Sequence, residues 1–125
     1  MRLLNLTPVL ETKDVKRTIE FYVEVLGFKQ AGVIPNKENP TWTTLYKDSV
    51  YIMFARRNEH STIPRPLMSG SLYLYTDNVD QLWNELKDKA EIEYPIENFD
   101  YGMREFAIRD CNGYLLQIGQ DLQKS

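Results

Sequence analysis

The feature that most constrains the fold of this chain is an internal repeat. Asp14 and Asn78, two residues suited to cap a helix, lie 64 positions apart (78 − 14 = 64). After each of them, apolar residues recur at helical spacing, which predicts helices over Asp14–Leu26 and Asn78–Ala90. Gly27 is a typical stop for the first helix. The expected buried faces are Val15, Ile19, Tyr22, Val23 and Leu26 in the first helix, and Val79, Leu82, Trp83, Leu86 and Ala90 in the second.

The same offset relates two pairs of strand candidates. It carries Trp42–Tyr46 and Val50–Phe54 onto Phe106–Asp110 and Tyr114–Ile118, and a short turn joins the strands of each pair. The second turn contains Asn112-Gly113, a strong hairpin signal because both residues tolerate positive φ. One offset across helix and hairpin predicts two copies of a strand–helix–hairpin unit. The alternative is an α+β domain without a repeat.

A polar segment with two prolines separates the two copies. We expect residues 1–57 to form the first module, 58–68 a surface linker and 69–125 the second module, all within a single domain. The linker contains His60, the only histidine, which we expect to be exposed and without a catalytic role. The three arginines in and just before the linker, Arg56, Arg57 and Arg65, could guide an acidic ligand, but a charged linker is usually only solvated.

Composition and charge exclude several classes of function. Lys and Arg number 15 against 18 Asp and Glu, so the net charge of -3 lacks the basic footprint that phosphate-backbone binding needs. No apolar run approaches the roughly 20 residues that span a bilayer. The first residues lack the apolar core of a secretory signal, and a single cysteine, Cys111, suits a reducing compartment. We therefore expect a cytoplasmic protein with neither nucleic-acid nor membrane partners.

Two sequence motifs resemble a known superfamily. Lys13–Tyr22 followed by Val25–Phe28 resembles the opening signature of the vicinal oxygen chelate superfamily. Tyr101–Asp110 with Asn112–Tyr114 resembles the ending found in its bleomycin-resistance branch, to which the Gly-x-Arg-Glu-Phe stretch Gly102–Phe106 points. The resemblance implies an α+β fold of two tandem βαβββ modules that form a curved, cleft-bearing mixed sheet. It also implies a homodimer whose clefts use both chains.

The resemblance also implies where a metal would bind. Enzymes of this superfamily, among them glyoxalase I and the extradiol dioxygenases, hold a divalent metal through His, Gln or Glu. The matching positions here are Thr7, Met53, Ser71 and Gln117, which form two pairs at the repeat offset. Divalent metals in such sites favour imidazole and carboxylate, which none of the four supplies. We therefore expect no metal, no cofactor and no catalytic residue; the alternative is a metal-dependent lyase, isomerase or dioxygenase.

Aromatic residues give the expected cleft its chemistry. In bleomycin-resistance proteins two aromatic residues stack on the flat tail of the drug, and the matching positions are Trp42 and Tyr101. Met53 would add an adaptable wall, and we expect Thr7, Ser71 and Gln117 to line the same ligand-binding cleft. The resemblance predicts a non-catalytic protein that sequesters a planar and possibly cationic ligand such as an antibiotic. The alternatives are that Trp42 belongs to the core, and that the chain is a structural or regulatory module without a ligand.

Three further reactive residues have simpler explanations. Glu11 and Glu105 lie on strands that could border the cleft, where two carboxylates could do acid–base work or hold a metal. We prefer to interpret Glu105 as a surface or strand-edge carboxylate paired with Arg104 or Arg109. Cys111 lacks a nearby base in sequence, so we interpret it as a turn residue.

Overall fold

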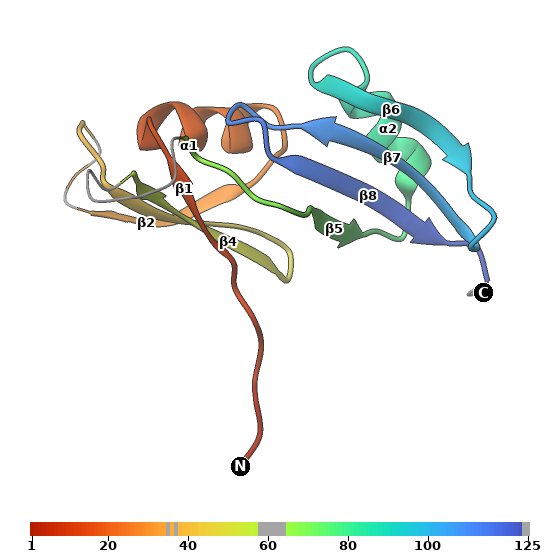
Figure 1. Cartoon of the computed structure of the whole chain (residues 1–125), viewed down its shortest axis with the longest axis horizontal. Helices are drawn as coiled ribbons and strands as arrows, with labels where there is room; N and C mark the ends of the chain where they lie inside the picture. The colour runs from red at the N-terminus through yellow and green to blue at the C-terminus, as the bar shows by residue number, and fades with distance from the viewer. Residues whose placement is uncertain (35, 37, 58–64, 124–125) are drawn as a thin grey trace. The chain divides into compact units, whose positions relative to one another are not determined.

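The computed structural model describes residues 1–34, 36, 38–57 and 65–123, and the chain divides into two compact units, Met1–Leu67 and Met68–Ser125. Each unit contains one helix and one four-stranded mixed sheet, so the fold is α+β with two tandem modules, as predicted (Figure 1). Most of the predicted linker 58–68, with His60, lies outside the described residues, so the module boundaries stay a prediction. No helix in the described ranges is long and apolar enough to cross a membrane.

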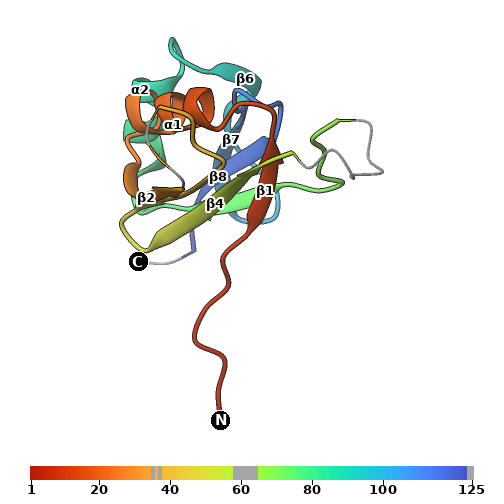
Figure 2. The same ribbon diagram turned by 90° about the vertical axis from the view of Figure 1, so that its left-hand side faces the viewer.

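The first unit is a sheet with a helix against one face (Figure 2). Along the chain its elements are β1 (Val9–Thr12), α1 (Val15–Glu24), β2 (Lys29–Ile34), β3 (Trp42–Lys47) and β4 (Val50–Arg56). The strands pair in the order β1-β4-β3-β2. β1 runs parallel to β4, and the other neighbours are antiparallel.

The second unit repeats this arrangement. Its elements are β5 (Leu72–Tyr75), α2 (Val79–Leu86), β6 (Glu91–Asn98), β7 (Met103–Arg109) and β8 (Leu115–Asp121). The strand order β5-β8-β7-β6 corresponds element by element to that of the first unit, and β5 is again parallel to its neighbour. The repeated topology confirms that the two halves are copies of one unit.

Both helices begin where the sequence predicts. The side chain of Asp14 accepts a hydrogen bond from the backbone N–H of Arg17 at 3.0 Å, and that of Asn78 accepts one from Gln81 at 3.1 Å. Each bond satisfies a donor that the first helical turn cannot pair internally. The two caps confirm the predicted helix starts.

The helices end earlier than the apolar pattern suggests. α1 ends at Glu24, because the chain turns at Gly27, whose φ of 78° is in the left-handed region. The N–H of Phe28 then donates to the carbonyl of Tyr22 at 2.8 Å and closes the helix end. The prediction of Gly27 as the stop is confirmed, and Leu26 belongs to the terminating turn.

Aromatic packing forms the core of the first unit. Tyr22 is fully buried, with its ring centroid 5.3 Å from that of Phe28 and 5.1 Å from that of Phe54. The predicted helix face is wrong at Val23, which is 38% exposed, while Thr18 is fully buried. A helix turns about 100° per residue, so Val23 lies at the margin of the buried face that contains Tyr22.

The core of the second unit lies between its sheet and α2. The ring of Trp83 on α2 lies 5.2 Å from that of Phe106 in an edge-to-face contact. Alternate residues of β7 and β8 are buried on this side: Phe106, Ile108, Leu116 and Ile118. Because successive strand residues point to opposite faces, the intervening residues project from the face without a helix. We call this the helix-free face; it carries Glu105, Ala107, Gln117 and Gly119.

Strand pairing corrects the single repeat offset. Thr43 pairs with Phe54 in the first hairpin, and Phe106 pairs with Ile118 in the second. The offset is therefore 63 between β3 and β7 (106 − 43 = 63), but 64 between β4 and β8 (118 − 54 = 64). The turn between β7 and β8 is one residue longer than its counterpart, which shifts β7 by one position.

This shift changes the counterpart of Trp42. Trp42 pairs with Ala55 in the first unit, as Glu105 pairs with Gly119 in the second. Trp42 thus corresponds to Glu105 and lies on the face of its sheet opposite α1, half-buried. A one-residue slip moves a strand residue to the other face, so the uncorrected offset would have placed Trp42 against the helix.

We predict that Asp14→Ala lowers the free energy of unfolding by about 1 kcal/mol, because α1 loses the side-chain acceptor at its start. Asn78→Ala should cost a similar amount in the second unit. Urea unfolding followed by circular dichroism measures both values. Lys16→Ala, at an exposed helical position, is the control and should change stability little. Equal stability of Asp14→Ala and the control would show that the cap does not matter.

Candidate functional site

A buried carboxylate occupies the helix-free face of the second unit. Glu105, on β7, has no exposed surface. The hydroxyl of Tyr73, on β5, donates to its Oε1 at 2.7 Å, and the hydroxyl of Tyr94, on β6, donates to its Oε2. Buried charge is tolerated only where hydrogen bonds replace its hydration, and both carboxylate oxygens meet this requirement.

The expected pairing of Glu105 with an arginine is wrong. Arg104 instead bonds Asp80 at 3.0 Å, and Arg109 bonds Glu93 at 2.9 Å. Arg104 is the neighbour of Glu105 on β7 and therefore points to the other face, where it meets Asp80 of α2. Arg109 lies four residues from Glu105, at the end of β7, where it meets Glu93 of β6. Glu105 is therefore a central residue of the face and not an edge carboxylate.

Two predicted site residues extend this network. The Nε2 of Gln117 donates to the hydroxyl of Tyr94 at 3.0 Å, and the hydroxyl of Ser71 donates to Oε1 of Gln117 at 2.5 Å. The structure therefore brings Ser71 and Gln117 into direct contact, and joins them to Glu105 through Tyr94. We call Ser71, Tyr73, Tyr94, Glu105 and Gln117 the Glu105 cluster.

Hydrogen bonding and burial shift the pKa values within the cluster. Burial by itself raises the pKa of the Glu105 carboxyl, but hydrogen bonds from Tyr94, Tyr73 and Tyr101 outweigh it, so this pKa is lowered. Burial, together with the hydrogen bond to Glu105, raises the pKa of Tyr94 to about 12. The same causes raise the pKa of Tyr73 further. At neutral pH the cluster thus contains an ionised carboxylate and protonated phenols.

A glycine makes room for one of these phenols. A Cβ added at Gly119, on β8, would lie 2.9 Å from Cζ of Tyr73 and closer still to its hydroxyl. Such a contact is shorter than packed atoms tolerate, so a side chain at this position would displace the Tyr73 ring. Gly119 therefore allows Tyr73 to reach Glu105 across the neighbouring strand.

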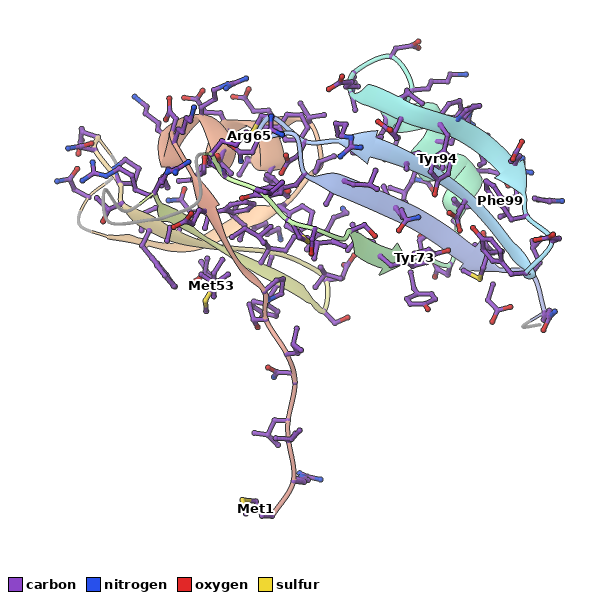
Figure 3. All side chains as sticks on the ribbon, in the orientation of Figure 1. Met1, Met53, Arg65, Tyr73, Tyr94 and Phe99 are labelled. Atoms are coloured by element: carbon purple, nitrogen blue, oxygen red, sulfur yellow. The ribbon has the colours of Figure 1, made fainter. Side chains whose placement is uncertain are left out.

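Aromatic rings surround the cluster. The rings of Phe99 and Tyr101 stack with centroids 5.4 Å apart and an interplanar angle of 12°. Phe99, labelled with Tyr94 and Tyr73 in Figure 3, also meets the Tyr94 ring edge-on at a centroid distance of 5.7 Å. The ring centroid of Tyr75 lies 5.0 Å from that of Tyr73. Tyr75 is 75% exposed and Tyr101 58% exposed, so both offer ring surface to a ligand.

Sequence patterns did not point to Tyr73, Tyr94, Phe99 or Gly119 as site residues. One available signal was the alternation of Tyr73 and Tyr75, which places two phenols on one face of β5, with Ser71 just before that strand.

The other predicted site residues lie in the first unit. Thr7 is half-buried two residues before β1, and Met53 is half-buried on β4, where it pairs with Val9. Trp42 and Glu11 are also half-buried on strands of this sheet. Because these residues and the Glu105 cluster belong to different units, a cleft that both line stays a prediction.

A model of the Glyoxalase/Bleomycin resistance protein/Dioxygenase superfamily matches residues 6–118. The chain belongs to this superfamily. No curated protein matches the sequence significantly.

Several solved structures share the fold of this chain. TioX from Micromonospora sp. ML1 is 20% identical, with a TM-score of 0.78 over 95% of this chain and 99% of that one. The bleomycin-binding protein of bleomycin-producing Streptomyces verticillus, complexed with copper(II)-bleomycin, is 22% identical with a TM-score of 0.69 over 99% of both chains. Lactoylglutathione lyase from Agrobacterium tumefaciens is 18% identical, with a TM-score of 0.69 over 94% of this chain and 92% of that one. At these identities the likeness shows the fold.

The residues at the four positions that the sequence resemblance assigns to a metal do not suit a divalent metal. Ser71 and Gln117 supply a hydroxyl and an amide that bond each other, and Gln117 Oε1 is the acceptor in that bond. Thr7 and Met53 supply a hydroxyl and a thioether, which are poor partners for such metals. Within residues 1–34, 36, 38–57 and 65–123, no group of three His, Cys, Asp or Glu residues is placed to hold a metal. Cys111 is half-buried in the turn between β7 and β8.

We predict that Gly119→Ala lowers the free energy of unfolding by about 1–3 kcal/mol, because the new methyl group displaces Tyr73 and leaves Glu105 short of a donor. Urea unfolding measures the change. Gly70→Ala is the matched control, since its Cβ would meet no atom within 4 Å. Adding Tyr73→Phe to Gly119→Ala removes the clashing hydroxyl and should cost less than the sum of the two single changes. Equal stability of Gly119→Ala and Gly70→Ala would contradict this account.

Proposed function

We propose that this protein binds a planar small molecule, such as an antibiotic, without a metal, and acts by sequestering it. The observation that carries the proposal is the exposed Tyr101 ring, stacked on Phe99 beside the Glu105 cluster. An aromatic face next to an ionised carboxylate suits a flat ligand, and a cationic one in particular.

The protonation states of the cluster support binding over acid–base catalysis. A general acid or base works best when its pKa lies near the operating pH. Here the pKa of Glu105 is lowered and that of Tyr94 is raised to about 12, so both move away from neutrality. Glu105 therefore keeps its charge and Tyr94 keeps its proton near neutral pH, which suits ligand binding better than proton transfer.

The comparisons support a small-molecule ligand in general terms. The Streptomyces verticillus protein binds bleomycin, whereas the Agrobacterium tumefaciens protein is a lyase on the same fold. A metal-dependent lyase, isomerase or dioxygenase is therefore the competing function. The unsuitable donors at Thr7, Met53, Ser71 and Gln117 favour the binding protein.

We predict that bleomycin or another planar heteroaromatic compound raises the melting temperature of the protein, and that Tyr101→Ala weakens its binding about tenfold. Calorimetric titration gives the affinity, and circular dichroism the stability. Tyr51→Ala, which truncates a 46% exposed tyrosine of the first unit, is the control.

The same binding and stability assays test the role of Trp42, and metal analysis of the purified protein tests the metal-dependent alternative. Trp42→Ala should weaken binding far more than it lowers the free energy of unfolding; a comparable loss of stability would assign Trp42 to the core. Stoichiometric Ni, Mn, Fe or Zn in the purified protein would favour the metal-dependent enzyme. A protein to which no planar compound binds would overturn the proposal.

We also propose a cytoplasmic homodimer with clefts shared between chains. The extended segment before β1 leads away from its sheet in both ribbon views (Figures 1 and 2) and carries four exposed apolar residues. These are Met1, Leu3, Leu4 and Leu6, each at least 78% exposed. Association that covers them would remove an apolar surface from water.

We predict a dimer at micromolar concentration in sedimentation experiments. Replacing both Leu3 and Leu4 by Ser should shift the equilibrium towards monomer, because less apolar surface is buried on association. Leu122→Ser, at a 47% exposed leucine of the second unit, is the control. A monomeric wild-type protein would exclude the shared clefts.

A further inference from the structure

We propose that Glu105 sets the hydrogen-bond polarity of the helix-free face, so that the site selects planar ligands carrying N–H donors and rejects ligands that offer only acceptors. This inference rests on the proposed function and specifies the ligand class of the same site. It assigns Glu105 a role in specificity through Tyr73, Tyr94 and the residues bonded to them.

All the hydrogen bonds of the cluster run towards Glu105. Ser71 donates to Gln117, and Gln117 donates to Tyr94. Tyr94 and Tyr73 then donate to the two carboxylate oxygens. An ionised carboxylate can only accept, so it determines where both phenol protons point.

This direction leaves acceptors at both ends of the network. A hydroxyl has one proton to donate, and the hydroxyls of Ser71 and Tyr73 already donate theirs to Gln117 and Glu105. Further partners of these two oxygens must therefore donate. Both residues are half-buried, so part of each remains open to solvent.

The amide of Gln117 is oriented by the same network. Its Nε2 donates to Tyr94, whose own proton is committed to Glu105, and its Oε1 receives the proton of Ser71. A flipped amide would set Nε2 against Ser71 and Oε1 against Tyr94, and would require both hydroxyls to reverse. The carboxylate therefore fixes the polarity as far as Ser71, three hydrogen bonds away.

The chemical class of ligand follows from these acceptor oxygens and from the exposed aromatic rings of Tyr75 and Tyr101. Exposed ring surface at Tyr75 and Tyr101 suits a flat body. Acceptor oxygens at Ser71 and Tyr73 suit amidinium, guanidinium or amide N–H groups on that body. A carboxylate ligand would meet lone pairs and the charge of Glu105, and a site built for donors discriminates strongly against a ligand that lacks them.

The experiment compares three planar probes by NMR titration of the full chain. Benzamidinium is a cation with N–H donors, trimethylphenylammonium is a cation without them, and benzoate is an acceptor anion. We expect wild-type protein to bind benzamidinium about tenfold more tightly than either of the others. Glu105→Gln adds an amide donor that forces one tyrosine to accept, which frees its proton, so this preference should fall to near unity.

Two further variants make the result specific. Glu85→Gln removes the same charge from an exposed position on α2 and should keep the wild-type preference. Tyr73→Phe removes an acceptor oxygen, together with one hydrogen bond to Glu105, but keeps the carboxylate itself. It should lower the benzamidinium preference even if Glu105→Gln fails to fold.

The outcomes separate this inference from the proposed function. Equal binding of benzamidinium and trimethylphenylammonium, or an unchanged preference in folded Glu105→Gln, would overturn the polarity role and leave a planar-ligand site standing. Failure of all three probes to bind at millimolar concentration would count against both proposals.

Discussion

The second unit is organised around one buried negative charge. Removing a carboxylate from water costs several kcal/mol unless hydrogen bonds replace its hydration. Glu105 obtains these bonds from Tyr73 and Tyr94, which the sheet brings in from β5 and β6. The absence of a side chain at Gly119 is part of the same arrangement, because the Tyr73 ring lies over that residue. The polar character of this face therefore depends on satisfying one carboxylate.

The two units share one topology but carry different side chains at corresponding positions. Where the second unit has Glu105 opposite Gly119, the first has Trp42 opposite Ala55. Likewise Gln117 corresponds to Met53 in the shared pairing pattern. The first sheet thus has Trp42 and Met53 at the positions where the second has Glu105 and Gln117, which belong to a hydrogen-bond network.

Local signals in the sequence predicted the secondary structure well. The caps at Asp14 and Asn78 and the stop at Gly27 depend only on residues within a few positions, so they could be inferred without the fold. The repeat offset was right for the helices and β8 but wrong by one for β7. A turn one residue longer shifts the register of the strand before it, and the composition of the turn does not reveal its length.

The sequence by itself determined the two-module architecture and the helix starts. Only the tertiary structure decided that Glu105 is buried and which residues donate hydrogen bonds to it. Tyr73 and Tyr94 lie 32 and 11 positions from Glu105 along the chain. Strand pairing across β5-β8-β7-β6 brings them together, and that pairing is a long-range property of the sheet. From sequence alone, a charged residue in a strand is expected to be exposed. Only the structure shows the hydrogen-bond donors that allow Glu105 to be buried.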